Sequence, residues 1–399
     1  MANMHDYLTW RGDISFEERP FNIADNVILA TLSYLDFSGI VAGERQGRSI
    51  KLSLACQRLL DRAGDDVAPF VRSLARLDAR FVQLVGQSRR FGSAMLHSYA
   101  DIVDESRSLQ FAALQVDLPS GETYVSFRGT DTTLVGWREN FMLGFEVTEA
   151  QREARIYLEQ ALAQAQERGR RVLVGGHSKG GNLAEYASVT CARDLRERIV
   201  AVYTNDGPGM SPDVMRADSR EVLGDRLVRV VPTYSVIGML FSRPDDPCTI
   251  VRSNATGIGQ HDPITWQMLP TGLAEASELL PDCRVLNESI AEWAAGVPLD
   301  ERERMTDEVF DALEAGGANT FDEIAATPEG RQKVLRALLE TDDKTRDLAM
   351  ALVERMVNTS VGAMREALAQ WRRGALEAAD DARRRLQEAS EERHQNKRP

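Results

Sequence analysis

The sequence predicts an α/β fold, a mostly parallel sheet flanked by helices, followed by an all-helical C-terminal extension. Two observations lead to this prediction. In the middle of the chain, short apolar runs typical of buried strands alternate with segments whose apolar residues recur at helical spacing, which is the pattern of βαβ units. After about residue 270 no further strand pattern is found, and residues 285–399 have helical periodicity only.

The N-terminal part is predicted to be mostly helical. Apolar residues at helical spacing predict helices over 24–38, 48–62 and 66–88. The pattern then changes to alternating stretches rich in Val, Tyr and Phe, at 109–118 and 122–130. Because Pro-Ser-Gly at 119–121 separates these two stretches, we expect them to pair as a hairpin.

The middle of the chain alternates between helix and strand patterns. Helical periodicity predicts helices over 147–168 and 180–195. Apolar runs predict strands at 171–176, 198–206, 226–234 and 248–253. Strands and helices that alternate at this spacing predict a parallel sheet.

Composition excludes several classes of protein. The 399 residues carry a net charge of −13, so the broad basic surface that binds nucleic acid is not expected. The four cysteines form no CxxC pair and no histidine belongs to an HExxH motif, so we expect neither a metal site nor another cofactor. No run of about 18 apolar residues predicts a transmembrane helix, and the N-terminus lacks the apolar run of a signal peptide. A cytoplasmic location is expected.

The strongest local signal is the run GGHSKGG at 175–181. It contains G-x-S-x-G as Gly176, Ser178 and Gly180, between a predicted strand and a predicted helix. A strand–turn–helix with this motif is the nucleophile elbow of serine hydrolases, in which a strained turn presents the hydroxyl at the carboxyl edge of the sheet. The glycines remove Cβ atoms that would clash with the strand and the helix. Ser178 is therefore the candidate nucleophile.

A serine nucleophile needs a histidine as its base, in the chain order Ser, Asp or Glu, His. Only two histidines follow Ser178, and His394 lies in the charged tail, so His261 is the candidate by elimination. His177, beside the nucleophile, is expected to point away from the site.

The acid that orients the base has more than one candidate. Asp206 ends the next predicted strand after the elbow strand, which puts its carboxylate at the same edge of the sheet. Asp245 and Asp246 follow a later strand and remain alternatives. Asp262 adjoins His261, but neighbouring side chains on an extended backbone diverge, which disfavours it.

An oxyanion hole needs two preorganised N–H donors. One is the backbone N–H of Lys179, which follows the nucleophile. The other is expected in VSFRGTDTT at 125–133, where Gly129 allows a tight turn and Thr130 supplies an N–H and a hydroxyl. Arg128 is expected to hold this loop by pairing with Asp131 or with a neighbouring carboxylate.

These motifs resemble two related families. FRGT, then Trp137, then GHSKGG resembles the class 3 lipase family. The similarity to the Mbeg1-like family is closer and rests on motifs spread over residues 5–270: YLxWxGD from Tyr7, PFNxxD from Pro20, the elbow with Lys179 in place of leucine, NDGPG from Asn205, SVIGM from Ser235, and QHDPxxW from Gln260. The resemblance implies an α/β-hydrolase fold and a Ser–Asp–His triad. It also implies a departure, because class 3 lipases carry the acid after the next strand, where this chain has Ser235.

The sequence therefore predicts a catalytic domain over 1–275, with an N-terminal helical lead-in, and a helical extension with a charged tail over 276–399. The expected reaction is hydrolysis of a small-molecule ester or lipid through an acyl-serine intermediate. A thioesterase or peptidase with the same triad, and a non-catalytic binding or scaffolding protein, remain alternatives. The apolar run 236–241 leaves a peripheral membrane contact open, and the oligomeric state is not set by the sequence.

Overall fold

The computed structural model describes residues 1–281 except 65, 74, 132–133, 144–145, 211–213 and 242–245, together with 301, 304, 307, 308, 310, 311 and 314. The chain divides into two compact units, Met1–Glu303 and Arg304–Pro399. The border expected at residue 275 and the helical extension expected over 276–399 fall largely outside the described residues, so both stay predictions.

A nine-stranded sheet forms the centre of the first unit within the described residues, in the order β1-β2-β3-β4-β5-β6-β7-β8-β11. Its strands are β1 Ile50–Lys51, β2 Met95–Asp104, β3 Leu109–Asp117, β4 Glu122–Phe127, β5 Arg171–His177, β6 Ile199–Asn205, β7 Leu227–Pro232, β8 Thr249–Val251 and β11 Glu275–Ala276. The strands from β4 to β8 pair in parallel, as the buried runs predict. Antiparallel strands extend the sheet at both edges, and β3 and β4 form the predicted hairpin. The short strands β9 Met268–Leu269 and β10 Gly272–Leu273 pair separately.

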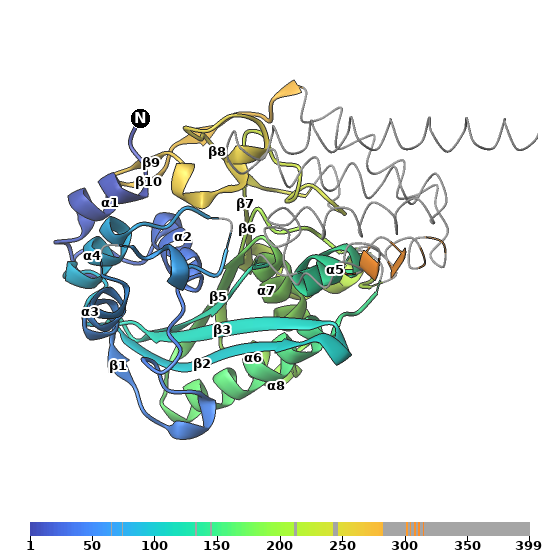
Figure 1. The fold of residues 1–399 in the computed structure, drawn as a ribbon, viewed down its shortest axis with the longest axis horizontal. Coiled ribbons are helices and arrows are strands. Elements are labelled where there is room, and N and C mark those ends of the chain that lie inside the picture. The colour runs from blue at the N-terminus through green and yellow to red at the C-terminus, as the bar shows by residue number, and fades with distance from the viewer. Residues whose placement is uncertain are drawn as a thin grey trace, which may run out of the picture. The chain divides into compact units, whose positions relative to one another are not determined.

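Helices cover both faces of the sheet (Figure 1). Their bounds are α1 Met4–Arg11, α2 Ile23–Leu32, α3 Leu52–Ala63, α4 Ala79–Gln87, α5 Leu134–Met142, α6 Glu149–Glu167, α7 Lys179–Thr190 and α8 Arg193–Arg196. Alternate strand residues enter two separate cores: Leu173 packs with α1 to α4, while Val172 and Val174 pack with α6 and α7. This period of two is what a strand buried on both faces requires. The result is the three-layered, α/β-hydrolase-like fold that the sequence predicts.

The local structure differs from the sequence-based prediction in several places. The helix expected over 66–88 begins only at Ala79, where the Asp78 side chain accepts from the N–H of Phe81 and caps the first turn. Strand β2 was not predicted, because its register shifts between His97 and Ala100 and the alternation of apolar residues is interrupted there. Helix α5 was not predicted either.

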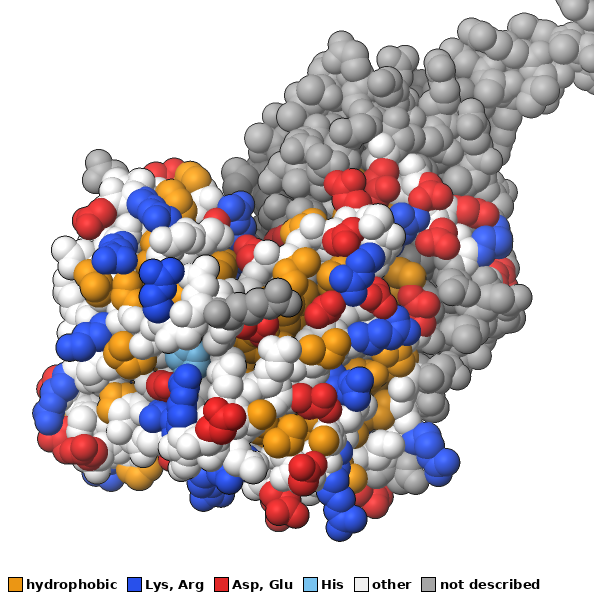
Figure 2. Space-filling view, turned by 90° about the horizontal axis from the view of Figure 1, so that it is seen from below, with side chains coloured by type: hydrophobic (Ala, Val, Ile, Leu, Met, Phe, Trp, Pro, Cys, Tyr) orange, Lys and Arg blue, Asp and Glu red, His pale blue; other side chains and the backbone are white. Residues whose placement is uncertain are grey.

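The surface mixes both signs of charge. On the face shown in Figure 2, Lys and Arg side chains lie among Asp and Glu side chains over the described part of the molecule. Arg107, for example, pairs with Glu149 and Glu153, and Arg89 lies 3.3 Å from Glu18. Exposed pairs of this kind stabilise a fold little.

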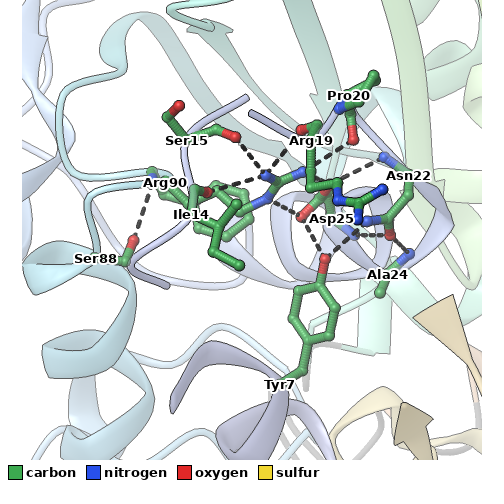
Figure 3. A network of polar contacts seen from close by, with 11 residues as sticks. Tyr7, Ile14, Ser15, Arg19, Pro20, Asn22, Ala24, Asp25, Ser88 and Arg90 are labelled. Atoms are coloured by element: carbon green, nitrogen blue, oxygen red, sulfur yellow. Dashed lines mark hydrogen bonds and ion pairs between the residues drawn. The ribbon is translucent and has the colours of Figure 1, made fainter. Parts of the chain in front are cut away.

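A buried ion pair fixes the N-terminal segment against the rest of the first unit (Figure 3). The guanidinium of Arg90 donates to both carboxylate oxygens of Asp25, at 2.7 and 2.5 Å, and both side chains are almost inaccessible to solvent. Its remaining hydrogens reach four backbone carbonyls, those of Ile14, Ser15, Arg19 and Pro20. The hydroxyl of Tyr7 donates to Asp25 and accepts from the amide of Asn22. The N-terminal motifs of the sequence thus surround one fully paired charge.

Candidate active site

Ser178 occupies a strained turn between β5 and α7. Its φ of 57° and ψ of −130° lie in a region that side chains rarely adopt. The flanking glycines allow the turn: a Cβ on Gly180 would lie 2.2 Å from the carbonyl oxygen of Phe127, and one on Gly176 would lie 2.3 Å from the carbonyl group of Gly180. Both approaches involve backbone atoms, so glycine is required at these two positions.

Asp206 lies directly after β6, the strand next to the elbow strand, and it too has a positive φ, of 48°. Its carboxylate is buried and accepts three hydrogen bonds. Oδ1 accepts from Ser235 Oγ at 2.5 Å and from the N–H of Gly238 at 3.2 Å, and Oδ2 accepts from His261 Nδ1 at 2.6 Å. These contacts fix both oxygens and direct one of them at the imidazole.

His261 ends the short 3-10 helix Gly257–His261, and about a quarter of its side chain is exposed. Because a carboxylate only accepts, the proton on the Asp206 side must be on Nδ1, which leaves Nε2 as the acceptor. In the described part of the chain neither Nε2 of His261 nor Oγ of Ser178 makes a hydrogen bond. The structure thus brings Asp206 and His261 into hydrogen-bond contact, while no hydrogen bond joins His261 to Ser178 among the described residues.

The alternative acids have other surroundings. Asp246 forms ion pairs with Arg220 and Arg229, at 2.9 and 2.8 Å. Asp245 lies outside the described residues. Asp262 accepts from the backbone N–H of Ile264 and caps the next turn of the chain.

Thr130 follows β4 in a loop that abuts the elbow. Its hydroxyl is buried and has no hydrogen-bond partner among the described residues. Arg128 holds this loop chiefly through Asp101 of β2, at 3.0 and 2.7 Å, and lies 4.0 Å from Asp131. The expected neighbouring carboxylate therefore comes from the strand that the sequence analysis missed.

Lys179 begins α7, so its N–H is one of the first-turn donors that lack an acceptor within the helix. Its side chain is fully buried and donates to the carbonyl oxygen and to Oε1 of Gln110, both at 2.6 Å, and to Oε2 of Glu139 at 3.0 Å. The charge beside the candidate nucleophile is thus neutralised in the interior. No sequence pattern pointed to Glu139 as its partner.

The prediction that His177 points away from the site is wrong. Its Nε2 lies 2.7 Å from the backbone oxygen of His261, and the two ring centroids are 4.6 Å apart. His177, the last residue of β5, therefore contacts the residue proposed as the base.

The described residues contain no group of three or more His, Cys, Asp or Glu side chains arranged to hold a metal ion. They also include no helix with the length and apolar character needed to cross a membrane.

A family model described as Mbeg1-like matches residues 85–311, which is more than half of the chain. The chain belongs to the Mbeg1-like family. The match begins near the end of α4 and includes the elbow, Asp206 and His261. The N-terminal motifs around Arg90 lie mostly before it.

Solved structures similar to this Mbeg1-like chain include fungal lipases. They are the Rhizomucor miehei lipase propeptide complex (18% identity, TM-score 0.29, 40% of this chain and 57% of that one), lipase II from Rhizopus niveus (14%, 0.33, 64% and 96%) and Lip2 lipase from Yarrowia lipolytica (14%, 0.32, 64% and 83%). The similarity thus spans little more than half of the Rhizomucor protein. A comparison with curated proteins found no match. At these TM-scores the fold assignment rests on the strand order and the connections of this chain itself.

Proposed function

We propose that this Mbeg1-like protein is a serine hydrolase that cleaves a small-molecule ester or lipid through an acyl-serine intermediate. The observation that carries the proposal is the 2.6 Å contact between Asp206 and His261, whose ring lies against that of His177, the residue before a serine in a strained strand–helix turn. A nucleophile, a base and an orienting acid on three neighbouring loops at one sheet edge are the groups that this chemistry needs.

In the proposed mechanism, Ser178 Oγ attacks the ester carbonyl carbon while its proton passes to Nε2 of His261. Asp206 holds Nδ1–H and stabilises the imidazolium that forms. The tetrahedral intermediate collapses, the C–O bond to the leaving alcohol breaks, and Nε2 returns the proton to the leaving oxygen. Water then attacks the acyl-serine with the same base, which releases the acid and restores Ser178.

The oxyanion is proposed to bind the backbone N–H of Lys179 together with the N–H and hydroxyl of Thr130. Two features support this role: the first-turn position of Lys179 in α7, and the buried hydroxyl of Thr130, which has no hydrogen-bond partner among the described residues. Donors fixed before the reaction stabilise developing charge without reorganising. All the reacting groups proposed lie within residues 1–275, which we propose as the catalytic domain, with 276–399 as an accessory extension.

A fluorophosphonate probe tests the proposal, since it reacts with an activated serine. The full chain should be labelled, and Ser178→Ala should not. The matched control is Ser188→Ala, because Ser188 lies in the same helix with a buried hydroxyl but away from the turn. It should be labelled like the natural sequence. Labelling that survives in Ser178→Ala contradicts the assignment of the nucleophile.

Turnover assays then separate the classes of substrate. A series of p-nitrophenyl esters of increasing acyl length, a thioester and a peptide anilide should give turnover with the esters. Faster turnover of the thioester or the anilide would reassign the enzyme to the thioesterases or peptidases. A folded protein that is neither labelled nor active on any of them would be a binding or scaffolding protein.

A further inference from the structure

His177 connects the elbow to the loop that carries His261. Its Nε2 lies 2.7 Å from the backbone oxygen of His261, and its Nδ1 lies 2.7 Å from the hydroxyl of Tyr34. A carbonyl oxygen can only accept, so the ring proton must be on Nε2. Nδ1 then accepts from the Tyr34 hydroxyl, and a single tautomer satisfies both contacts.

Burial keeps this tautomer neutral. Both His177 and Tyr34 are nearly inaccessible to solvent, at 3% and 1% exposure. Burial lowers the pKa of His177 well below its usual range, and the positive charge of a protonated His261 lowers this pKa further. The hydrogen bonds therefore run in one direction, from Tyr34 to His177 and from His177 to the His261 carbonyl.

The glycine of the FRGT motif makes room for the arrangement. A Cβ on Gly129 would lie 2.3 Å from the Tyr34 hydroxyl and 2.7 Å from the backbone oxygen of His177. Any side chain at this position would displace the hydroxyl from the ring that it holds. Gly129 has an ordinary negative φ, so close approach rather than backbone conformation explains why glycine is needed.

The ring of His177 also limits how the ring of His261 can move. The two rings lie 4.6 Å apart at an interplanar angle of 38°, and the ring of Trp266 meets His177 edge-on at 6.1 Å. Asp206 holds His261 through one nitrogen only, and a single hydrogen bond leaves a ring free to pivot about it. The tilted contact with the ring of His177 restricts this movement.

Resting on the proposed function, we propose that His177 is a positioning residue for the base, held in one tautomer by Tyr34. It holds the main chain of His261 through the carbonyl oxygen and restricts the imidazole through the contact between the two rings. A residue with a merely structural role would stabilise the fold and leave the turnover of each folded molecule unchanged, so the two roles make different predictions.

The experiment measures kcat and KM of the full chain, with each preparation normalised to the serine that a fluorophosphonate probe can label. His177→Phe keeps an aromatic ring but loses both hydrogen bonds, whereas His177→Gln keeps a donor and an acceptor. Tyr34→Phe removes only the hydroxyl. His97→Gln is the matched control, since it changes another buried histidine, on β2, which pairs with Asp117 and has no hydrogen bond or ring contact with the candidate site among the described residues.

We expect His177→Phe to lower kcat by about 10²-fold, the usual effect of a misplacement of about 1 Å, with little change in KM. Tyr34→Phe should lower kcat in the same direction, and His177→Gln should retain more of kcat than His177→Phe. The control should match the natural sequence. Unchanged kcat per labelled serine in both His177→Phe and Tyr34→Phe, or equal losses in the two His177 variants, would overturn the inference.

Failure of the proposed function gives a different result. In that case the natural sequence itself is not labelled at Ser178, and no variant is compared. If His177→Phe does not fold, Tyr34→Phe still tests the positioning role of His177. It removes only the hydroxyl oxygen that holds His177 and keeps the aromatic ring.

Discussion

Replacing Arg90 by Met should destabilise the first unit strongly. The substitution keeps much of the side-chain volume and removes the charge that pairs with Asp25. The two side chains are 1% and 0% exposed, so the carboxylate would remain buried without its cation. Removing one partner of a buried ion pair costs about 3–5 kcal/mol of the free energy of unfolding.

The structure puts Arg90→Met at the upper end of that range. Besides the ion pair, the guanidinium supplies hydrogen bonds to four backbone carbonyls between Ile14 and Pro20. A typical domain is stable by only about 5–15 kcal/mol, so the variant should be close to unfolding at room temperature. The consequence extends to the site, because Asn26, next to Asp25 in α2, donates to the side chain of Asn205, which precedes Asp206.

The assay is urea unfolding of the full chain, followed by tryptophan fluorescence and circular dichroism. The matched control is Arg89→Met, because Arg89 is 63% exposed and its partner Glu18 is also exposed. That variant should unfold at the same urea concentration as the natural sequence. Asp25→Asn and the double variant complete a cycle, whose coupling energy should be about 1–3 kcal/mol. Equal midpoints for Arg90→Met and Arg89→Met would refute the reasoning.

Three other substitutions test the structure around the site and the sheet. Lys179→Met leaves the carboxylate of Glu139 buried without a cation and should lower the free energy of unfolding by about 3–5 kcal/mol. The further change Glu139→Gln should restore much of this loss. A single variant as stable as the double variant would contradict the argument. Gly180→Ala brings a Cβ to 2.2 Å from a carbonyl oxygen of β4 and should abolish labelling by the probe, so labelling at the natural rate would show that the turn can relax. Burial alone raises the pKa of Asp117, but the His97 ring, 3.3 Å away, and the hydrogen bond from the Thr123 hydroxyl outweigh it and hold this pKa at about 2. The ionised carboxylate therefore adds stability above its unfolded pKa of about 4 and loses it as the pH falls toward 2, so the stability difference between the natural sequence and Asp117→Asn should shrink over that interval in urea titrations.

Buried strands and sharp turns were the features that the sequence predicted well. Runs such as 171–176 and 198–206 have one physical explanation, burial on both faces of a parallel sheet, and they became β5 and β6. The sharp turn at Ser178 was predicted because glycine at 176 and 180 has few other reasons to flank a serine between a strand and a helix, while the catalytic role of the turn stays a proposal. The order of strands then put Asp206 and His261 at one edge, where the structure brings them together.

Contacts of distant residues with the backbone, and strained backbone positions, were the features that the sequence could not predict. Tyr34 and His177 are 143 positions apart, and the role of His177 depends on a carbonyl oxygen that carries no sequence signal. The bulge in β2 likewise depends on Ser98, which adopts a positive φ of 54° without being glycine. Local periodicity and propensity describe neither a backbone acceptor nor a tolerated strain, so such features become visible only in the folded chain.

Within the proposed mechanism, the acid follows β6 in this chain, whereas in class 3 lipases it follows the next strand. Class 3 lipases, which this sequence resembles, carry the acid after the strand where this chain has Ser235. Here the carboxylate comes from Asp206, one strand earlier, and Ser235 donates to it at 2.5 Å. Ser235 therefore contacts the carboxylate oxygen that His261 does not use. Ser235→Asp alone would set two carboxylates against each other and should lower turnover. Combining Asp206→Ser with Ser235→Asp leaves one carboxylate, now on the following loop. This double variant should regain turnover if the position of the charge, rather than the strand that carries it, governs the orientation of the base.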